Sequence, residues 1–227
     1  MRLLFSFLLI LNFFFASAQI RLKPLIGSGK CPNDKDTVGR FLVINTDGNE
    51  PGPKVGEPIH YFKLFGLNND SLDMVMELKK GKPLLLINGS YTCPFFRRTL
   101  QFFDSICTKN KKINCFIIYT IEGHPDYPYI CPYSNEPWEL KVNINDSIYI
   151  KQPRNYGERK QAARTMVAKT GTKIPVIIDG IANEWLNCFG IMPTNAFIIN
   201  PDGKVKYKYL DYKIQKKEII RDITSLK

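Results

Sequence analysis

The stretch PLLLINGSYTCPFF, residues 83–96, joins a continuous apolar run to a single cysteine that is followed by a proline. A short apolar run bounded by turn residues is typical of a strand buried on both faces, so residues 83–88 are predicted to form one. Pro94 suits the first turn of a helix, where its missing N–H would have no partner anyway. Cys93 is therefore expected at a strand-to-helix corner. Redox proteins often carry a second cysteine three residues after such a position, but here that residue is Phe96.

The rest of the chain alternates between apolar runs and helical patterns. After Cys93, apolar side chains recur at helical spacing through residue 107 and line one face of a helix. The further predicted elements are a strand over 113–121, a helix over 157–171, a strand over 174–179, a short helix over 182–190, a hairpin over 194–210 turning at Asp202-Gly203, and a helix over 213–226. This order predicts an α/β fold with a central mixed β-sheet flanked by helices. Together with this order, Pro193 before a strand points to a thioredoxin-like three-layer fold. In that fold a cis proline faces the active-site cysteine, so Pro193 is expected to face Cys93.

The first 18 residues have the parts of a secretory signal peptide. A basic start at Arg2 precedes an apolar run, and a small-residue cleavage pattern, Ala16-Ser17-Ala18, follows it. The apolar run is shorter than the roughly 20 residues that a membrane span needs. An exported protein, periplasmic or secreted and without stable membrane insertion, is therefore expected. Residues 19–56 are predicted to be an irregular extension, and residues 57–227 a single domain.

Composition argues against nucleic-acid and metal chemistry. The net charge is +11, but the lysines are scattered, with small clusters at 109–112 and 213–217, and no nucleic-acid motif accompanies them. A basic, solvated surface is therefore the preferred interpretation. There are two histidines, and no two of the six cysteines lie within four residues of each other, so zinc sites with C-x-x-C spacing are absent. Neither a metal nor another cofactor is expected.

The corner at Cys93 is suited to thiolate chemistry. Only the thiolate is a good nucleophile, and a helix N-terminus favours it through unpaired N–H groups and partial positive charge. Thr92 and Ser90 are candidate hydroxyl donors to the site. Arg97 and Arg98, in the first helical turns, add positive potential if they face inward, although outward-facing arginines are more common. The alternative is a buried, inert cysteine.

The other cysteines are weaker candidates. Cys107 continues the apolar helix stripe and Cys115 lies in a predicted buried strand, so both are expected to be core thiols. Cys188, in a short helix, is either a core residue or close to the site. Cys131 is the best candidate for a resolving thiol, and a structural disulfide between Cys131 and Cys31 is an equal alternative because spacing cannot decide connectivity.

A second polar stretch, YTIEGHPDYP, ends the strand predicted at 113–121. In α/β sheets, ligands collect beyond the carboxyl ends of the strands. If strands 83–88 and 113–121 are parallel neighbours, Glu122 and His124 emerge beside Cys93. A histidine can exchange a proton during thiolate chemistry. The alternative is that His124 only caps the strand or pairs with a local carboxylate.

Several segments together resemble the iodothyronine deiodinases. They are PLLLINGSYTCPFF, YTIEGHP, YIKQPRNYGERKQAA and PVIIDGIANEWLNCFGIMPTNAFIINPDGKVKYK, within residues 80–210. The resemblance implies a thioredoxin-like fold, reductive dehalogenation with an external thiol reductant, and a homodimer. Cys93 stands where the family has selenocysteine and would be the nucleophile, with Glu122 and His124 as partners in proton transfer or substrate contact.

This chain departs from the family's pattern in several places. The selenium is replaced by sulfur, which is expected to slow dehalogenation. The segment after Pro125 reads DYPYI and continues into an insertion with Cys131 and Trp138. A family histidine aligns with Pro153, and an expected substrate-clamping arginine aligns near residues 210–211. The fold and the thiol centre are therefore expected to carry over, and the thyroid-hormone substrate is not.

Three functions follow as hypotheses. The first is an exported thiol oxidoreductase that uses Cys93 on a halogenated aromatic or, more generally, on a disulfide or a peroxide, completed by a resolving cysteine or an external thiol. The second is a peroxiredoxin-like thiol peroxidase, against which Ser90 stands where a peroxidatic site usually has threonine. The third is a non-catalytic thioredoxin-like binding module.

Overall fold

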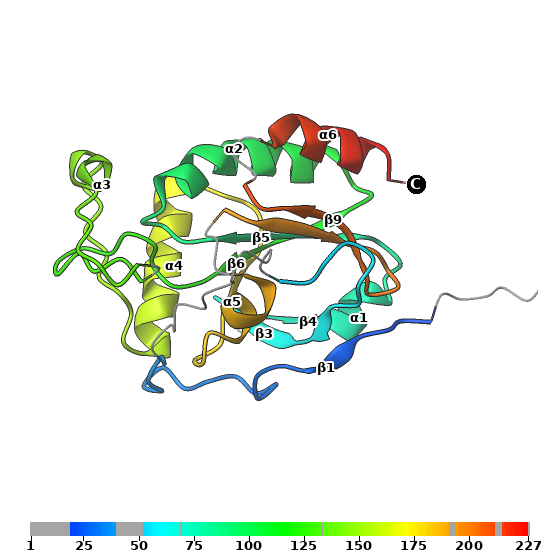
Figure 1. Ribbon diagram of the computed structural model, residues 1–227, viewed down its shortest axis with the longest axis horizontal. Helices are drawn as coiled ribbons and strands as arrows, with labels where there is room; N and C mark the ends of the chain where they lie inside the picture. The colour runs from blue at the N-terminus through cyan, green and yellow to red at the C-terminus, as the bar shows by residue number, and fades with distance from the viewer. Residues whose placement is uncertain are drawn as a thin grey trace, which may run out of the picture.

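The computed structural model describes residues 19–39, 52–68, 70–132, 134–190, 194–211 and 215–226. Its centre is a seven-stranded sheet in the order β4-β3-β7-β6-β5-β8-β9, with helices on both faces (Figure 1). Parallel and antiparallel pairs both occur in it, so the predicted mixed-sheet α/β fold is confirmed. No helix in the described ranges is long and apolar enough to cross a membrane.

The elements follow the chain in an alternating order. They are β1 (Lys23–Leu25), β2 (His60–Tyr61), β3 (Lys63–Gly66), β4 (Ser71–Asp73), α1 (Met74–Leu78), β5 (Leu84–Gly89), α2 (Pro94–Lys109), β6 (Asn114–Tyr119), α3 (Lys141–Asn145), α4 (Tyr156–Thr170), β7 (Val176–Ile178), α5 (Glu184–Phe189), β8 (Ala196–Ile199), β9 (Val205–Tyr209) and α6 (Lys216–Thr224). The hairpin of β8 and β9 turns where it was predicted, and Gly203 there has φ +85°.

Strands β5 and β6 form the parallel pair on which the site depends. Their register runs from Leu84 opposite Asn114 to Gly89 opposite Tyr119. All six residues of β5 are buried, as the continuous apolar run predicted. Because the two strands are parallel and in register, the segments that leave their carboxyl ends meet at one edge of the sheet.

The sheet separates two apolar layers. Leu85 and Ile87 face the layer under α2, α4 and α6, whereas Leu84 and Leu86 face the layer under α1 and α5. This alternation follows from the two-residue repeat of a strand. The second layer is rich in aromatic rings, and Trp185 stacks on Phe189 with ring centroids 3.8 Å apart.

The N-terminal extension is less irregular than predicted. Its segment β1 pairs in parallel with β2, and the backbone N–H of Val38 donates to the carbonyl of Arg154 at 2.9 Å. These contacts tie the described part of the extension to the domain. The predicted signal peptide, residues 1–18, lies outside the described residues.

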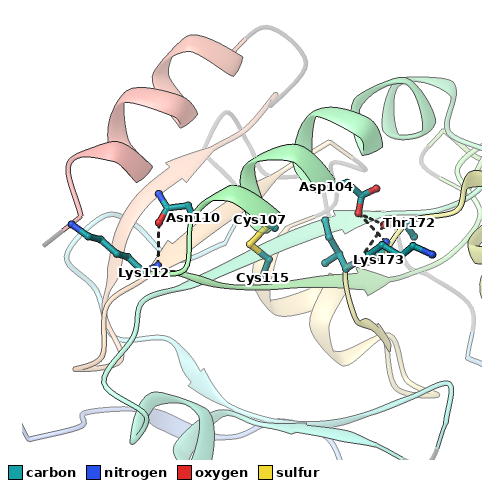
Figure 2. Close-up of a disulfide and its surroundings, with 8 residues drawn as sticks. Asp104, Cys107, Asn110, Lys112, Cys115, Thr172 and Lys173 are labelled. Carbon is teal, nitrogen blue, oxygen red and sulfur yellow. Dashed lines mark hydrogen bonds between the residues drawn. A yellow bond between two sulfur atoms is a disulfide. The ribbon is translucent and has the colours of Figure 1, made fainter.

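Cys107 and Cys115 form a disulfide, so the prediction of two core thiols was wrong (Figure 2). Cys107 lies on the inward face of α2. Cys115 lies on the same face of β6 as Ile117 and Tyr119. Helical and strand periodicity therefore placed both side chains in one layer, where their Cα atoms are 6.0 Å apart. Periodicity gives the face on which a side chain lies but not the side chain opposite it.

Candidate active site

Cys93 is the N-cap residue of α2, one short turn beyond the end of β5. Its backbone N–H donates to the carbonyl of Ser90 at 3.2 Å, and its own carbonyl accepts from Arg97 N–H at 3.1 Å. The turn can lie this close to the helix because residue 89 is glycine: a β-carbon there would overlap the ring of Phe96. The predicted strand-to-helix corner is thus present at Cys93.

The Cys93 side chain is only 1% exposed. Burial raises the pKa of its thiol, because removal from water disfavours the thiolate. The backbone N–H groups of Phe96 and Phe95 and the charge of Arg97 act in the opposite direction, and their combined effect on the pKa is smaller. The expected contribution of the helix N-terminus is therefore present, but the closed structure favours the neutral thiol.

Glu122 holds the residue that precedes Cys93. Its Oε2 accepts the backbone N–H of Thr92 at 3.0 Å and the Thr92 hydroxyl at 2.8 Å, while its Oε1 accepts the Tyr119 hydroxyl. Glu122 and Thr92 have no exposed surface. Burial raises the pKa of Glu122 despite these donors, so this carboxyl group is suited to holding a proton.

His124 lies in the same network, as the parallel strands predicted. Its backbone N–H donates to the Thr92 hydroxyl at 3.0 Å, and the neighbouring Gly123 N–H donates to the Ser90 hydroxyl at 3.1 Å. Burial, and then the charge of Arg97, lower the pKa of His124, so its imidazole is neutral near pH 7. Its Nδ1 is buried without a hydrogen-bond partner within the described part of the chain.

The long polar segment after His124 contains α3, which no sequence pattern predicted. The side-chain amide of Asn143 donates to the carbonyls of Thr92 (2.9 Å) and His124 (3.3 Å). Asp146, just after α3, pairs with Arg97 at 2.8 Å. The other Arg97 nitrogen donates to the carbonyl of Tyr91 at 2.7 Å, so this arginine faces inward.

Sequence reasoning missed Tyr119, Asn143 and Gln152. Tyr119 carried a usable signal, because a tyrosine at the end of a buried strand needs a partner for its hydroxyl group. Gln152 exchanges two hydrogen bonds with the backbone of Glu122, at 2.9 and 3.1 Å. Asn143 and Gln152 belong to a segment without periodicity, so nothing in their spacing marked them.

Cys131 is free and 1% exposed, and Cys31 is free and exposed, so the alternative of a Cys31–Cys131 disulfide was wrong. The backbone N–H of Cys131 donates to the carbonyl of Glu136 at 2.9 Å. This turn is connected to the site through Trp138, whose ring meets the His124 ring edge-on with centroids 4.5 Å apart. Cys188 is free and partly buried.

Pro193, predicted to face Cys93, lies outside the described residues. No cluster of three or more potential metal ligands occurs among the residues that are described.

A groove of about 1440 Å³ runs beside the segment that follows β6. Ile121, Pro125, Gln152 and Tyr149 are among its lining residues, and Cys93 is not. Gln152 lines the groove and also exchanges hydrogen bonds with the backbone of Glu122. The site around Cys93 is closed in this structure.

Comparison with known proteins gives matches in sequence and in fold. The family model described as iodothyronine deiodinase matches residues 60–217. Type I iodothyronine deiodinase of Xenopus laevis is 29% identical over 132 residues, which cover 58% of this chain and 46% of that protein. The match thus spans less than half the length of this curated relative.

Solved structures with a similar fold include a putative protein disulfide isomerase from Bacteroides thetaiotaomicron. Its TM-score is 0.50 and its sequence identity is 13%. The match covers 77% of this chain and 90% of the chain of that protein. A peroxiredoxin-like protein from Aquifex aeolicus has the same TM-score and identity and covers 78% of this chain and 90% of its own. At such identities the similarity concerns the fold alone, and it confirms the thioredoxin-like class.

Proposed function

The chain belongs to the iodothyronine deiodinase family, and from this premise we propose that it is a thiol oxidoreductase with the Cys93 thiolate as nucleophile. Its reaction is reductive dehalogenation of a small aromatic halide or thiol–disulfide exchange. The observation that supports this proposal most is the meeting of two loops: Cys93 caps α2, and the Glu122 carboxylate of the neighbouring loop bonds Thr92.

In dehalogenation, the Cys93 thiolate takes the halogen X from an aryl halide ArX. A sulfenyl halide forms on Cys93, and the aryl carbanion accepts a proton to give ArH. One external thiol RSH displaces halide from the sulfur, and a second RSH releases Cys93 and RSSR. Overall, ArX and two RSH give ArH, RSSR and HX. In disulfide exchange, the thiolate attacks one sulfur of a disulfide, the other sulfur leaves as a thiolate, and an external thiol restores Cys93.

Dehalogenation needs a proton at the aryl carbon, and Glu122 is the group best placed to provide it. Burial raises its pKa, which favours a carboxyl group that carries a proton, and its Oε2 lies 2.8 Å from the hydroxyl of Thr92, next to Cys93. His124 is the second candidate, since a neutral imidazole can accept a proton from the Cys93 thiol. We assign the role of proton carrier to Glu122 and that of base or substrate contact to His124.

The cell context follows from the sequence pattern. We propose export through residues 1–18 and a thiol reductant from outside the chain, without a bound cofactor. Cys131 is the candidate resolving thiol, and a homodimer is the assembly that the family resemblance suggests.

The test compares three reactions of the full chain. Iodide release from an iodinated phenol, cleavage of a peptide disulfide with reduced glutathione, and peroxide consumption are measured for the wild type, Cys93→Ser and Cys188→Ser. We expect iodide release or disulfide cleavage that is lost in Cys93→Ser and kept in Cys188→Ser, the matched control. Peroxide consumption far above the other two would point to the peroxidase instead. No turnover in any of the three, with a co-purifying partner, would point to a binding module.

A further inference from the structure

The helix α3 is tied to the N-terminal turn of α2 by contacts of two side chains. Asn143, within α3, bonds the carbonyl of Thr92, the residue before Cys93. Asp146, just after α3, pairs with Arg97, one turn after Cys93. The α3 segment is therefore fastened to the chain just before and just after the candidate nucleophile, whose side chain is 1% exposed.

Within α3 itself the fastening is polar, and the first buried apolar side chain after the helix is Ile148. Asn143 is the one buried residue of the helix, and Ile144 is 38% exposed. The helix has five residues and no side-chain cap at its start, so it is too short to be stable by itself. It projects from the layered body at the opposite end of the molecule from β1 (Figure 1). Segments with few buried apolar contacts open at low free-energy cost.

We propose that α3 is a gate over Cys93 and that Arg97 is the positioning residue that links opening of the gate to reactivity of the thiol. The inference rests on the proposed function, in that it assumes a substrate that must reach Cys93. The gate is closed by hydrogen bonds from Asn143 and by the ion pair between Arg97 and Asp146.

Arg97 can act in this way because its guanidinium joins the two parts that separate. One nitrogen bonds the carbonyl of Tyr91 in the turn before Cys93, and another bonds Asp146 of the gate. When the gate is closed, Asp146 balances the charge of Arg97 and burial disfavours the thiolate. When it opens, water reaches Cys93 and the Arg97 charge loses its partner, so both changes favour the thiolate. The thiol would thus become reactive when a substrate can enter.

The test measures alkylation of Cys93 by iodoacetamide in the full chain, quantified on the Cys93 peptide by mass spectrometry over a pH series. The rate at the high-pH plateau reports access to the sulfur, and the midpoint reports its ionisation. The charged and titratable groups around the thiol are Tyr91 and Arg97 beside it, Glu122 and His124 from the loop after β6, and Asp146 from the gate.

Variants of the gate should raise the plateau rate. Asp146→Asn should raise it by about two- to fivefold, the range expected from loss of a partly exposed ion pair. Asn143→Ala should raise it by about tenfold, because two hydrogen bonds to the site are lost. Glu57→Gln is the matched control: it removes a carboxylate of similar exposure that pairs with Lys23 of β1, far from α3, and should leave the rate unchanged (Figure 1).

The midpoint of alkylation against pH shows whether opening of α3 also changes the ionisation of Cys93 or only exposes it. Asp146→Asn should lower the midpoint, because Arg97 keeps its charge without a partner. Arg97→Gln should also raise the plateau but give a higher midpoint than Asp146→Asn, and Arg97→Lys should bring the midpoint back down. Equal midpoints for Asp146→Asn and Arg97→Gln would overturn the role of Arg97.

Wild-type plateau rates in both Asp146→Asn and Asn143→Ala would overturn the gate. That result is distinct from a failure of the proposed function. If Cys93→Ser abolishes turnover while the gate variants leave alkylation unchanged, the function stands and the gate does not. If the gate variants expose Cys93 and no substrate is turned over, the gate stands and the function does not.

Discussion

The Glu122 carboxylate binds Thr92 twice, accepting its backbone N–H at 3.0 Å and its hydroxyl group at 2.8 Å through one oxygen. Glu122 follows β6, and Thr92 lies in the turn after β5, so this pair joins the ends of two parallel strands. It fixes the backbone directly before Cys93. The same carboxyl group therefore has a positioning role and, by our proposal, a role in proton transfer.

Replacing Glu122 by Gln should separate these two roles. Glutamine keeps an oxygen that can accept from Thr92 but cannot carry the proton, so turnover should fall by about 100-fold. The free energy of unfolding should change by only about 1 kcal/mol, since most of the contact is kept. Turnover is followed by iodide release or disulfide cleavage and stability by urea unfolding. Unchanged turnover in Glu122→Gln would exclude proton transfer by this residue, and Glu158→Gln serves as the control for loss of a carboxylate elsewhere.

Oxidation of the protein by one equivalent of peroxide tests Cys131 as the resolving thiol. The Cys93 thiolate and peroxide give a sulfenic acid and hydroxide, and a second thiol then condenses with the sulfenic acid to give a disulfide and water. In the wild type without reductant, peptide mapping should find a Cys93–Cys131 disulfide. In Cys131→Ser, the sulfenic acid on Cys93 should persist and react with dimedone. A free Cys131 thiol beside an oxidised Cys93 in the wild type would contradict the prediction.

The sequence predicted the strands that carry the site but did not predict α3, which is fastened to it. Residues 83–88 and 113–121 carried continuous apolar runs, and buried parallel strands have this pattern because helices cover both faces. The contact of the turn before Cys93 with the segment of Glu122 and His124 then followed from parallel geometry alone. By contrast, α3 has no hydrophobic periodicity, because its only buried residue is an asparagine. Its position depends on hydrogen bonds to distant backbone carbonyls, which leave no trace in residue spacing.

The cysteines illustrate the same limit. Cys107 and Cys115 were correctly placed on buried faces, but their disulfide depends on the register between α2 and β6. The 1% exposure of Cys93 could not be predicted from the chain either, because it depends on how segments distant in sequence pack around its turn. The sign of the pKa shift at Cys93 therefore required the structure.

The Cys107–Cys115 disulfide should contribute to stability and not to turnover. It closes a loop with a sequence separation of 8, and chain-entropy arguments give about 2.5 kcal/mol for a loop of this size. The double variant Cys107→Ala/Cys115→Ala should lose this amount in urea unfolding and keep wild-type turnover. A reductant should lower the stability of the wild type to that of the variant and leave the variant unchanged. A wild type whose stability is indifferent to reductant would contradict this prediction.

His124 should titrate below the ordinary histidine value of 6.5. Burial lowers its pKa, the charge of Arg97 adds to this effect, and Trp138 covers one side of its ring. The chain has two histidines, so the ring proton signals of the wild type and His60→Asn identify His124 by NMR. Trp138→Ala should move its midpoint upward, because water then reaches the ring. An equal midpoint in the wild type and Trp138→Ala would show that Trp138 does not control the environment of His124.

Asp179 should give the folded protein a pH dependence in the acid range. It is fully buried after β7, where Oδ1 accepts the N–H groups of Gly180 and Trp185 at 2.8 and 2.9 Å. Burial raises its pKa from 3.8 to about 6, against the opposing charge of Arg159. The folded state therefore binds the proton more tightly than the unfolded state does. The resulting stabilisation is complete below pH 3.8 and is lost as the pH rises through about 6.

Asp179→Asn isolates this contribution, because asparagine does not titrate. The free energy of unfolding of the wild type, relative to that of the variant, should fall by about 3 kcal/mol as the pH rises across this interval. Using the difference between the two proteins removes the contribution of the other carboxyl groups, which titrate in both. Urea unfolding at a series of pH values provides the measurement. A difference that stays constant would mean that folding leaves the pKa of Asp179 unchanged, and one that rises with pH would mean that Arg159 and the N–H donors lower this pKa in the folded protein.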